Sequence, residues 1–250
     1  MAFCELKYYN KALGKSTACD ILLPEQNKTG PFPVLYLLHG YSDDNTIWQR
    51  RTSIERYVQN LPLIVVMPDA SISFYCDAVE GLPWETAIVR DLVGYVDTLF
   101  QTNASREGRC LAGLSMGGYG AAKFALKFPD VFCAAVSHSG AMRFAHGAMP
   151  YDADEKRRTE QRHILGNEQI GGANDLFALA AKLTPEQRPA LRIDCGTEDF
   201  LIEHNREFDA YLPEIGFPHE YVEFPGDHNW EYWDAHIQEA ITFLKPHIGL

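Results

Sequence analysis

The sequence predicts an α/β fold, in which a mostly parallel sheet is flanked by helices within a single domain of residues 1–250. Short apolar runs, too short for buried helices and suited to strands covered on both faces, alternate with stretches whose apolar residues recur at helical spacing. This alternation is typical of parallel strands joined by helical crossovers. A chain of 250 residues, 46% of them hydrophobic, is also long enough for one such domain with a sizeable core.

The predicted strands begin with an antiparallel pair at the sheet edge, residues 3–9 and 18–23, followed by a loop rich in proline and glycine. The core strands are then expected at residues 34–38, 63–67, 110–112, 132–137, 191–195 and 220–224. Apolar residues at three- and four-residue spacing predict helices around residues 89–99 and 230–244, and residues 119–128 are also compatible with a helix.

Residues 142–190 interrupt this alternation between two predicted strands. Long excursions at such a point cover the carboxyl ends of the strands, so we expect a cap or lid insertion. It contains a charged cluster at residues 152–158, then two glycines and a short helical pattern at 176–183. Because acidic residues lie close by, Lys156, Arg157 and Arg158 are expected to form a solvated face rather than an anion site.

Composition excludes several classes of partner. A formal net charge of -12 argues against nucleic acid and against an anionic membrane surface, because phosphates would be repelled. The six cysteines show no C-x-x-C and no cysteine–histidine cluster, so we expect reduced structural thiols, no metal and no cofactor. The start of the chain lacks signal-peptide features and no apolar run reaches membrane-spanning length, which predicts a cytoplasmic protein.

The most informative motif is Gly-Leu-Ser-Met-Gly at residues 113–117, between a predicted strand and a predicted helix. A serine on a sharp strand-to-helix turn projects its hydroxyl clear of the sheet, and the flanking glycines avoid collisions with the strand and the helix. A chance match is the alternative, but the flanking patterns disfavour it. Ser115 is therefore the predicted nucleophile, and it needs a neighbouring base.

Among nine histidines, His228 alone directly follows the last predicted strand, in a loop at the same sheet edge as Ser115. It is the predicted base, with a packed structural histidine as the alternative. Asp199, after the preceding strand, is the predicted acid, with Glu198 as its nearest rival. Asp194 lies inside that strand, and Asp227 is expected to point away from the imidazole.

The oxyanion of an acyl-transfer intermediate needs preorganised backbone donors. One predicted donor is the amide of Met116, and the second is the amide of Tyr41, after the first core strand. His39 precedes Ser115 in the chain, the wrong order for the base, and is expected to brace the loop. Five aromatic residues are expected near this edge, where they line a pocket or pack in the core: Trp48, Phe74, Tyr75, Trp84 and Trp230.

These motifs resemble those of a known family: LLHGY at 37–41, GLSMGG at 113–118, SHSG at 137–140, CGTEDFL at 195–201 and PGDHNW at 225–230. They look like the esterase D branch of the α/β-hydrolases, which includes S-formylglutathione hydrolases, feruloyl esterases, tributyrin-type esterases and antigen 85 mycolyltransferases. The resemblance is closest to the small tributyrin- and feruloyl-type esterases. It implies the α/β-hydrolase fold and the same roles for Ser115, Asp199, His228, Tyr41 and Met116.

The function expected is that of a serine carboxylesterase that forms an acyl-enzyme and acts on small-molecule esters. The resemblance implies short-chain or aryl-acyl substrates. Two alternatives stay open: a thioesterase or acyltransferase with the same three side chains, and a non-catalytic binding protein on a hydrolase fold. The sequence leaves the oligomeric state open, including a homo-oligomer.

Overall fold

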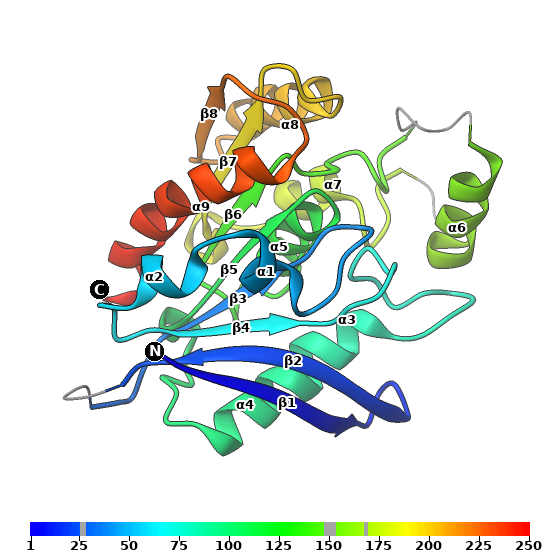
Figure 1. Cartoon of the computed structure of the whole chain (residues 1–250). Coiled ribbons are helices and arrows are strands. Elements are labelled where there is room, and N and C mark those ends of the chain that lie inside the picture. The colour runs from blue at the N-terminus through cyan, green and yellow to red at the C-terminus, as the bar shows by residue number, and fades with distance from the viewer. Residues whose placement is uncertain (26–28, 148–153, 168–169) are drawn as a thin grey trace.

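The computed structural model describes residues 1–25, 29–147, 154–167 and 170–250. At its centre is an eight-stranded sheet in the order β1-β2-β4-β3-β5-β6-β7-β8 (Figure 1). β1 pairs antiparallel with β2 and β2 with β4, whereas every other neighbouring pair is parallel. The strands are β1 (Ala2–Asn10), β2 (Lys15–Leu23), β3 (Val34–Leu38), β4 (Ile64–Pro68), β5 (Arg109–Leu114), β6 (Ala134–His138), β7 (Ala190–Gly196) and β8 (Glu220–Phe224). The predicted fold class is confirmed.

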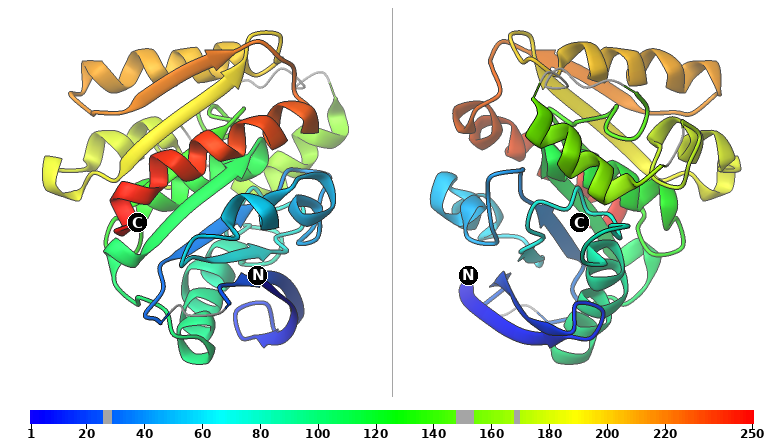
Figure 2. Two further views of the ribbon diagram at one scale, coloured as in Figure 1. Left: turned by 60° about the vertical axis from the view of Figure 1, so that its left-hand side comes forward. Right: turned by 90° about the vertical axis from the view of Figure 1, so that its right-hand side faces the viewer.

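Helices cover both faces of this sheet (Figure 2). Alternate residues of β3 show the division, because Tyr36 and Leu38 join one buried cluster and Leu35 and Leu37 the other. The first cluster includes residues of α3 (Trp84–Thr86), α4 (Val93–Leu99), α5 (Met116–Lys127), α7 (Leu176–Lys182) and α8 (Ile202–Glu214), and a π-helical segment, Ala87–Leu92, joins α3 to α4. The second includes residues of α1 (Ile47–Arg51), α2 (Ile54–Val58) and α9 (Trp230–Leu244).

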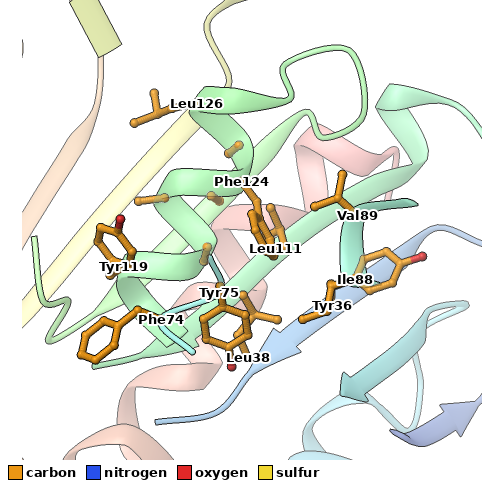
Figure 3. Packing of buried hydrophobic residues seen from close by; sticks show 14 of the residues in the cluster. Tyr36, Leu38, Phe74, Tyr75, Ile88, Val89, Leu111, Tyr119, Phe124 and Leu126 are labelled. Carbon is orange, nitrogen blue, oxygen red and sulfur yellow. The ribbon is translucent and has the colours of Figure 1, made fainter. Parts of the chain in front are cut away.

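Figure 3 shows the first cluster around α5, where Tyr119 and Phe124 of the helix lie with Leu111 of β5 and Tyr36 of β3. Each large side chain buried in this way stabilises the fold by about 1.5–3 kcal/mol. This packing fixes α5, and with it the turn that precedes it, against the carboxyl ends of β3 and β5.

Two predictions about the elements were inaccurate. The helix expected at 119–128 begins at Met116, because the chain passes from β5 into α5 through the single residue Ser115. The last strand, β8, was expected to be covered on both faces, but four of its residues are half-buried and Glu220 is exposed. Among the residues that the structure describes, β8 lies at the sheet edge and pairs with β7 alone, so it has less cover than the central strands.

Residues 142–190 contain α6 (Glu155–Leu165) and α7. Parts of this predicted cap, residues 148–153 and 168–169, lie outside the described residues. Lys156 is 77% exposed, as a solvated face requires. Arg157 differs, because its guanidinium carbon lies 4.4 Å from the ring centre of Tyr41. Arg157 is also half-buried, so the prediction of a solvated face was wrong for this residue, because only the folded chain brings Tyr41 against it.

The six cysteines are all free thiols, and five of them are buried. Within the described ranges, none of the helices has both the length and the apolar character needed to cross a bilayer.

Candidate active site

Ser115 occupies a strained turn between β5 and α5, with φ +55° and ψ -115°. A Cβ on Gly113 would lie 2.3 Å from the carbonyl oxygen of Gly117, and a Cβ on Gly117 would lie 2.4 Å from that of Leu38. Neither position can hold a larger residue without moving backbone. The motif thus folds as expected, and Ser115 is half-buried within an otherwise buried segment.

The imidazole of His228 bridges Ser115 and Asp199. Its Nε2 lies 3.0 Å from Ser115 Oγ, and its Nδ1 lies 2.8 Å from Asp199 Oδ2. Asp199 is buried, and its other oxygen accepts a hydrogen bond from the Leu201 amide at 2.8 Å. With the Nδ1 proton donated to Asp199, Nε2 is left to accept the serine proton. The structure brings together the three side chains that the sequence selected.

The rival carboxylates are engaged elsewhere. Glu198 is exposed and accepts a hydrogen bond from the Gly226 amide at 2.6 Å, which lowers its pKa. Asp194 is fully buried and accepts from Nδ1 of His138 at 2.9 Å. Asp227 accepts from the backbone amide of His228 at 2.7 Å, so its carboxylate turns to the loop rather than to the imidazole.

The predicted oxyanion loop follows β3, whose last residue, Leu38, pairs with Gly113 of β5. Tyr41 and Ser115 line the same cavity, while Met116 is the first residue of α5. His39 braces the loop, because its Nε2 accepts from the Ala70 amide at 2.9 Å and its Nδ1 donates to the Gly40 carbonyl at 2.7 Å. Burial lowers the pKa of His39, which favours the neutral ring that this pattern requires.

Two aromatic rings that the sequence did not single out for the site enclose the His228 imidazole. The ring centre of Phe200 lies 4.5 Å away, and that of Trp233 lies 4.9 Å away at an edge-on angle of 89°. Trp233 is itself held by a 3.2 Å hydrogen bond from its Nε1 to Ser139 Oγ. In the sequence, Trp233 is one of the apolar residues whose spacing predicts the helix at residues 230–244. Its place in the site could have been predicted from its position, because it is an aromatic residue one turn into the helix that follows the predicted base.

A cavity of about 580 Å³ opens over Ser115 and His228. Of the five aromatic residues expected near this edge, Phe74 and Trp230 line it, whereas Trp48, Tyr75 and Trp84 are buried and do not. Its volume is in the range of small-molecule sites. The remaining lining combines apolar side chains (Leu114, Ala141, Phe200, Leu201, Trp233) with charged ones (Asp43, Arg51, Arg157, Glu231).

The model of the family described as "Putative esterase" matches residues 10–244. The chain belongs to this esterase family. An acetyl esterase of Caldicellulosiruptor saccharolyticus is 29% identical to the esterase over 262 residues, which cover 98% of each protein.

Two solved structures from Staphylococcus aureus are also similar to the esterase: FphF, a fluorophosphonate-binding serine hydrolase, and the S-formylglutathione hydrolase FrmB. Each is 34% identical, with a TM-score of 0.86 over 97% of this chain and 98% of the other. The family resemblance predicted from the motifs is confirmed, and the protein is a serine hydrolase of carboxylic esters.

Proposed function

We propose that the esterase hydrolyses short-chain or aryl-acyl esters through an acyl-enzyme formed on Ser115. The observation that carries this proposal is the position of His228, 3.0 Å from the serine oxygen and 2.8 Å from Asp199. Ser115 Oγ attacks the ester carbonyl while Nε2 takes its proton. The imidazolium, paired with Asp199, then gives that proton to the departing alcohol.

The second half of the reaction uses the same groups with water as the nucleophile. His228 removes a proton from water as the hydroxide attacks the acyl carbonyl, and returns the proton to Ser115 Oγ as the carboxylic acid leaves. The amides of Tyr41 and Met116 stabilise both tetrahedral oxyanions. Supporting this assignment, Gly117 lies tightly against the Leu38 and His39 carbonyls, so the start of α5 and the loop after β3 adjoin each other.

The cavity supports the proposed substrate class. Its volume of about 580 Å³ suits a small acyl group, and Phe74, Phe200 and Trp230 offer aromatic walls for an aryl acid. We take residues 142–190 as a cap within a single hydrolase domain. Two contacts support this reading, because Arg157 of α6 lines the cavity and the Tyr41 hydroxyl donates to Glu160 of the same helix.

A series of p-nitrophenyl esters with acetyl, butyryl, octanoyl and feruloyl groups tests the proposal. We expect the highest kcat/KM for acetyl, butyryl or feruloyl, and a loss of about 10⁴-fold or more in kcat for Ser115→Ala. A fluorophosphonate probe should label the parent and not this variant. Ser137→Ala is the matched control, because it removes a fully buried serine hydroxyl on the neighbouring strand. A Ser115→Ala variant as active as the parent would refute the mechanism.

Acyl transfer from a thioester is the second candidate, favoured by the 34% identity to a protein named S-formylglutathione hydrolase. The same three side chains would cleave either bond. Comparing kcat/KM for S-formylglutathione and p-nitrophenyl acetate separates the two, since a preference of 100-fold or more for the thioester would replace the esterase assignment. Adding a short alcohol and measuring ester formation tests transfer to an acceptor other than water.

A further inference from the structure

A strained turn lies beneath the predicted oxyanion loop. Phe74 and Tyr75 both adopt positive φ, at +48° and +57°, a region that residues other than glycine rarely occupy. Ser73 holds the turn, because its Oγ accepts the Tyr75 amide at 2.9 Å. Strain of this kind persists only where the surroundings enforce it, and it concentrates at functional sites.

The turn places the Tyr75 side chain against His39. Tyr75 is fully buried, and its hydroxyl donates to the His39 carbonyl at 2.9 Å. Burial raises the pKa of this phenol well above its usual value, so the hydroxyl remains a donor. The next carbonyl, that of Gly40, accepts from the His39 ring at 2.7 Å. Because that carbonyl shares a planar peptide with the Tyr41 amide, holding the two carbonyls sets the direction of the Tyr41 N–H.

Tyr75 also contacts α5, the helix that begins at Met116. The ammonium of Lys123, a buried residue of α5, donates to the Tyr75 carbonyl at 2.5 Å and pairs with Glu85 at 2.9 Å. A Cβ on Gly120 would lie 2.4 Å from the Tyr75 ring, so the helix and the ring are in close contact. Figure 3 shows Tyr75 beside α5 in the same cluster as Leu38.

We infer that Tyr75 is a positioning residue, which holds the two proposed oxyanion donors, the Tyr41 and Met116 amides, at a fixed separation. The inference rests on the proposed function, because it assigns Tyr75 to the oxyanion hole used by Ser115. Its hydroxyl fixes the loop after β3, and its carbonyl and ring are fixed to α5. Preorganised donors stabilise an oxyanion only when their directions do not relax during the reaction.

Tyr75→Phe tests this by removing a single hydroxyl. We expect kcat for p-nitrophenyl butyrate to fall about tenfold, with KM within about twofold of the parent value. Removing a whole oxyanion donor lowers kcat by about 10²–10³-fold, and the loss is smaller here because the donor stays in place and only its direction changes. Tyr36→Phe is the matched control: Tyr36 is equally buried, lies on β3, and its hydroxyl has no hydrogen-bond partner among the described residues. We expect Tyr36→Phe to keep kcat within about twofold of the parent.

Ser73→Ala provides a milder second variant, because it releases the Tyr75 amide while keeping the phenol. We expect it to lower kcat about threefold at unchanged KM, and it keeps the test decisive if Tyr75→Phe does not fold. Loss of kcat in the Tyr75 or Ser73 variant but not in Tyr36→Phe supports the inference. Equal kcat in all three folded variants, or a rise in KM alone, overturns it. Ser115→Ala is assayed in parallel, because its retained activity would instead overturn the proposed function.

Discussion

Replacing Asp199 by asparagine is the sharpest test of the proposed site, because the structure determines how the amide must sit. Asp199 Oδ1 accepts the Leu201 amide at 2.8 Å, and Oδ2 faces His228 Nδ1 at 2.8 Å. Asparagine has only one oxygen for these two donors. Leaving the buried Leu201 amide without an acceptor costs about 1–3 kcal/mol, whereas the imidazole can move its proton to the other nitrogen. The asparagine oxygen therefore stays on Leu201, and its NH₂ faces His228.

In this arrangement Nδ1 must accept, and the imidazole proton moves to Nε2, which then cannot take the proton of Ser115. We expect kcat to fall about 10³–10⁴-fold with KM little changed. At about 1.36 kcal/mol for each tenfold change, this corresponds to about 4–5.5 kcal/mol of transition-state stabilisation.

The assay is the initial rate of p-nitrophenyl butyrate hydrolysis at saturating substrate, between pH 6 and 9. Glu198→Gln is the matched control, because it neutralises the adjacent carboxylate yet keeps an oxygen for the Gly226 amide. We expect it to retain kcat within about twofold. The reasoning fails if folded Asp199→Asn keeps more than a tenth of the parent kcat, or if both variants lose activity equally.

Two further predictions concern stability. Gly120→Ala places a Cβ 2.4 Å from the Tyr75 ring and should lower the free energy of unfolding by about 1–3 kcal/mol, whereas Gly94→Ala, in open space on α4, should raise it by about 0.5–1 kcal/mol. Melting temperatures that shift in the same direction would contradict this. Because burial lowers the pKa of His39, the unfolded chain binds more protons, and stability is lost as the pH falls through about 6.5. The free energy of unfolding, measured by urea titration from pH 7 to 5.5, should therefore fall less steeply with pH in His39→Gln than in the parent protein, by at most about 1.4 kcal/mol per pH unit. If the two proteins show the same dependence on pH, His39 makes no such contribution.

Much of the fold could be read from local patterns. The strands at 34–38 and 220–224 have the predicted bounds, and the other core strands differ at their ends by one or two residues. Strand ends are set by hydrogen bonds to neighbouring strands, which no local pattern records. The solvent exposure of β8 and of Arg157 was mispredicted for a related reason. The exposure of a residue depends on which distant segment of the chain packs against it.

The turn around Ser115 and the order serine, acid, histidine were determined by the sequence itself. Turn residues and the alternation of strands with helices are local properties of the chain. Tertiary structure decided which of the neighbouring carboxylates meets His228, because only the folded backbone directs Asp199 inward and Glu198 outward. It also decided the contact between Tyr75 and His39, residues 36 positions apart. Contacts between distant residues depend on how the sheet and helices pack, and that information is absent from any single segment.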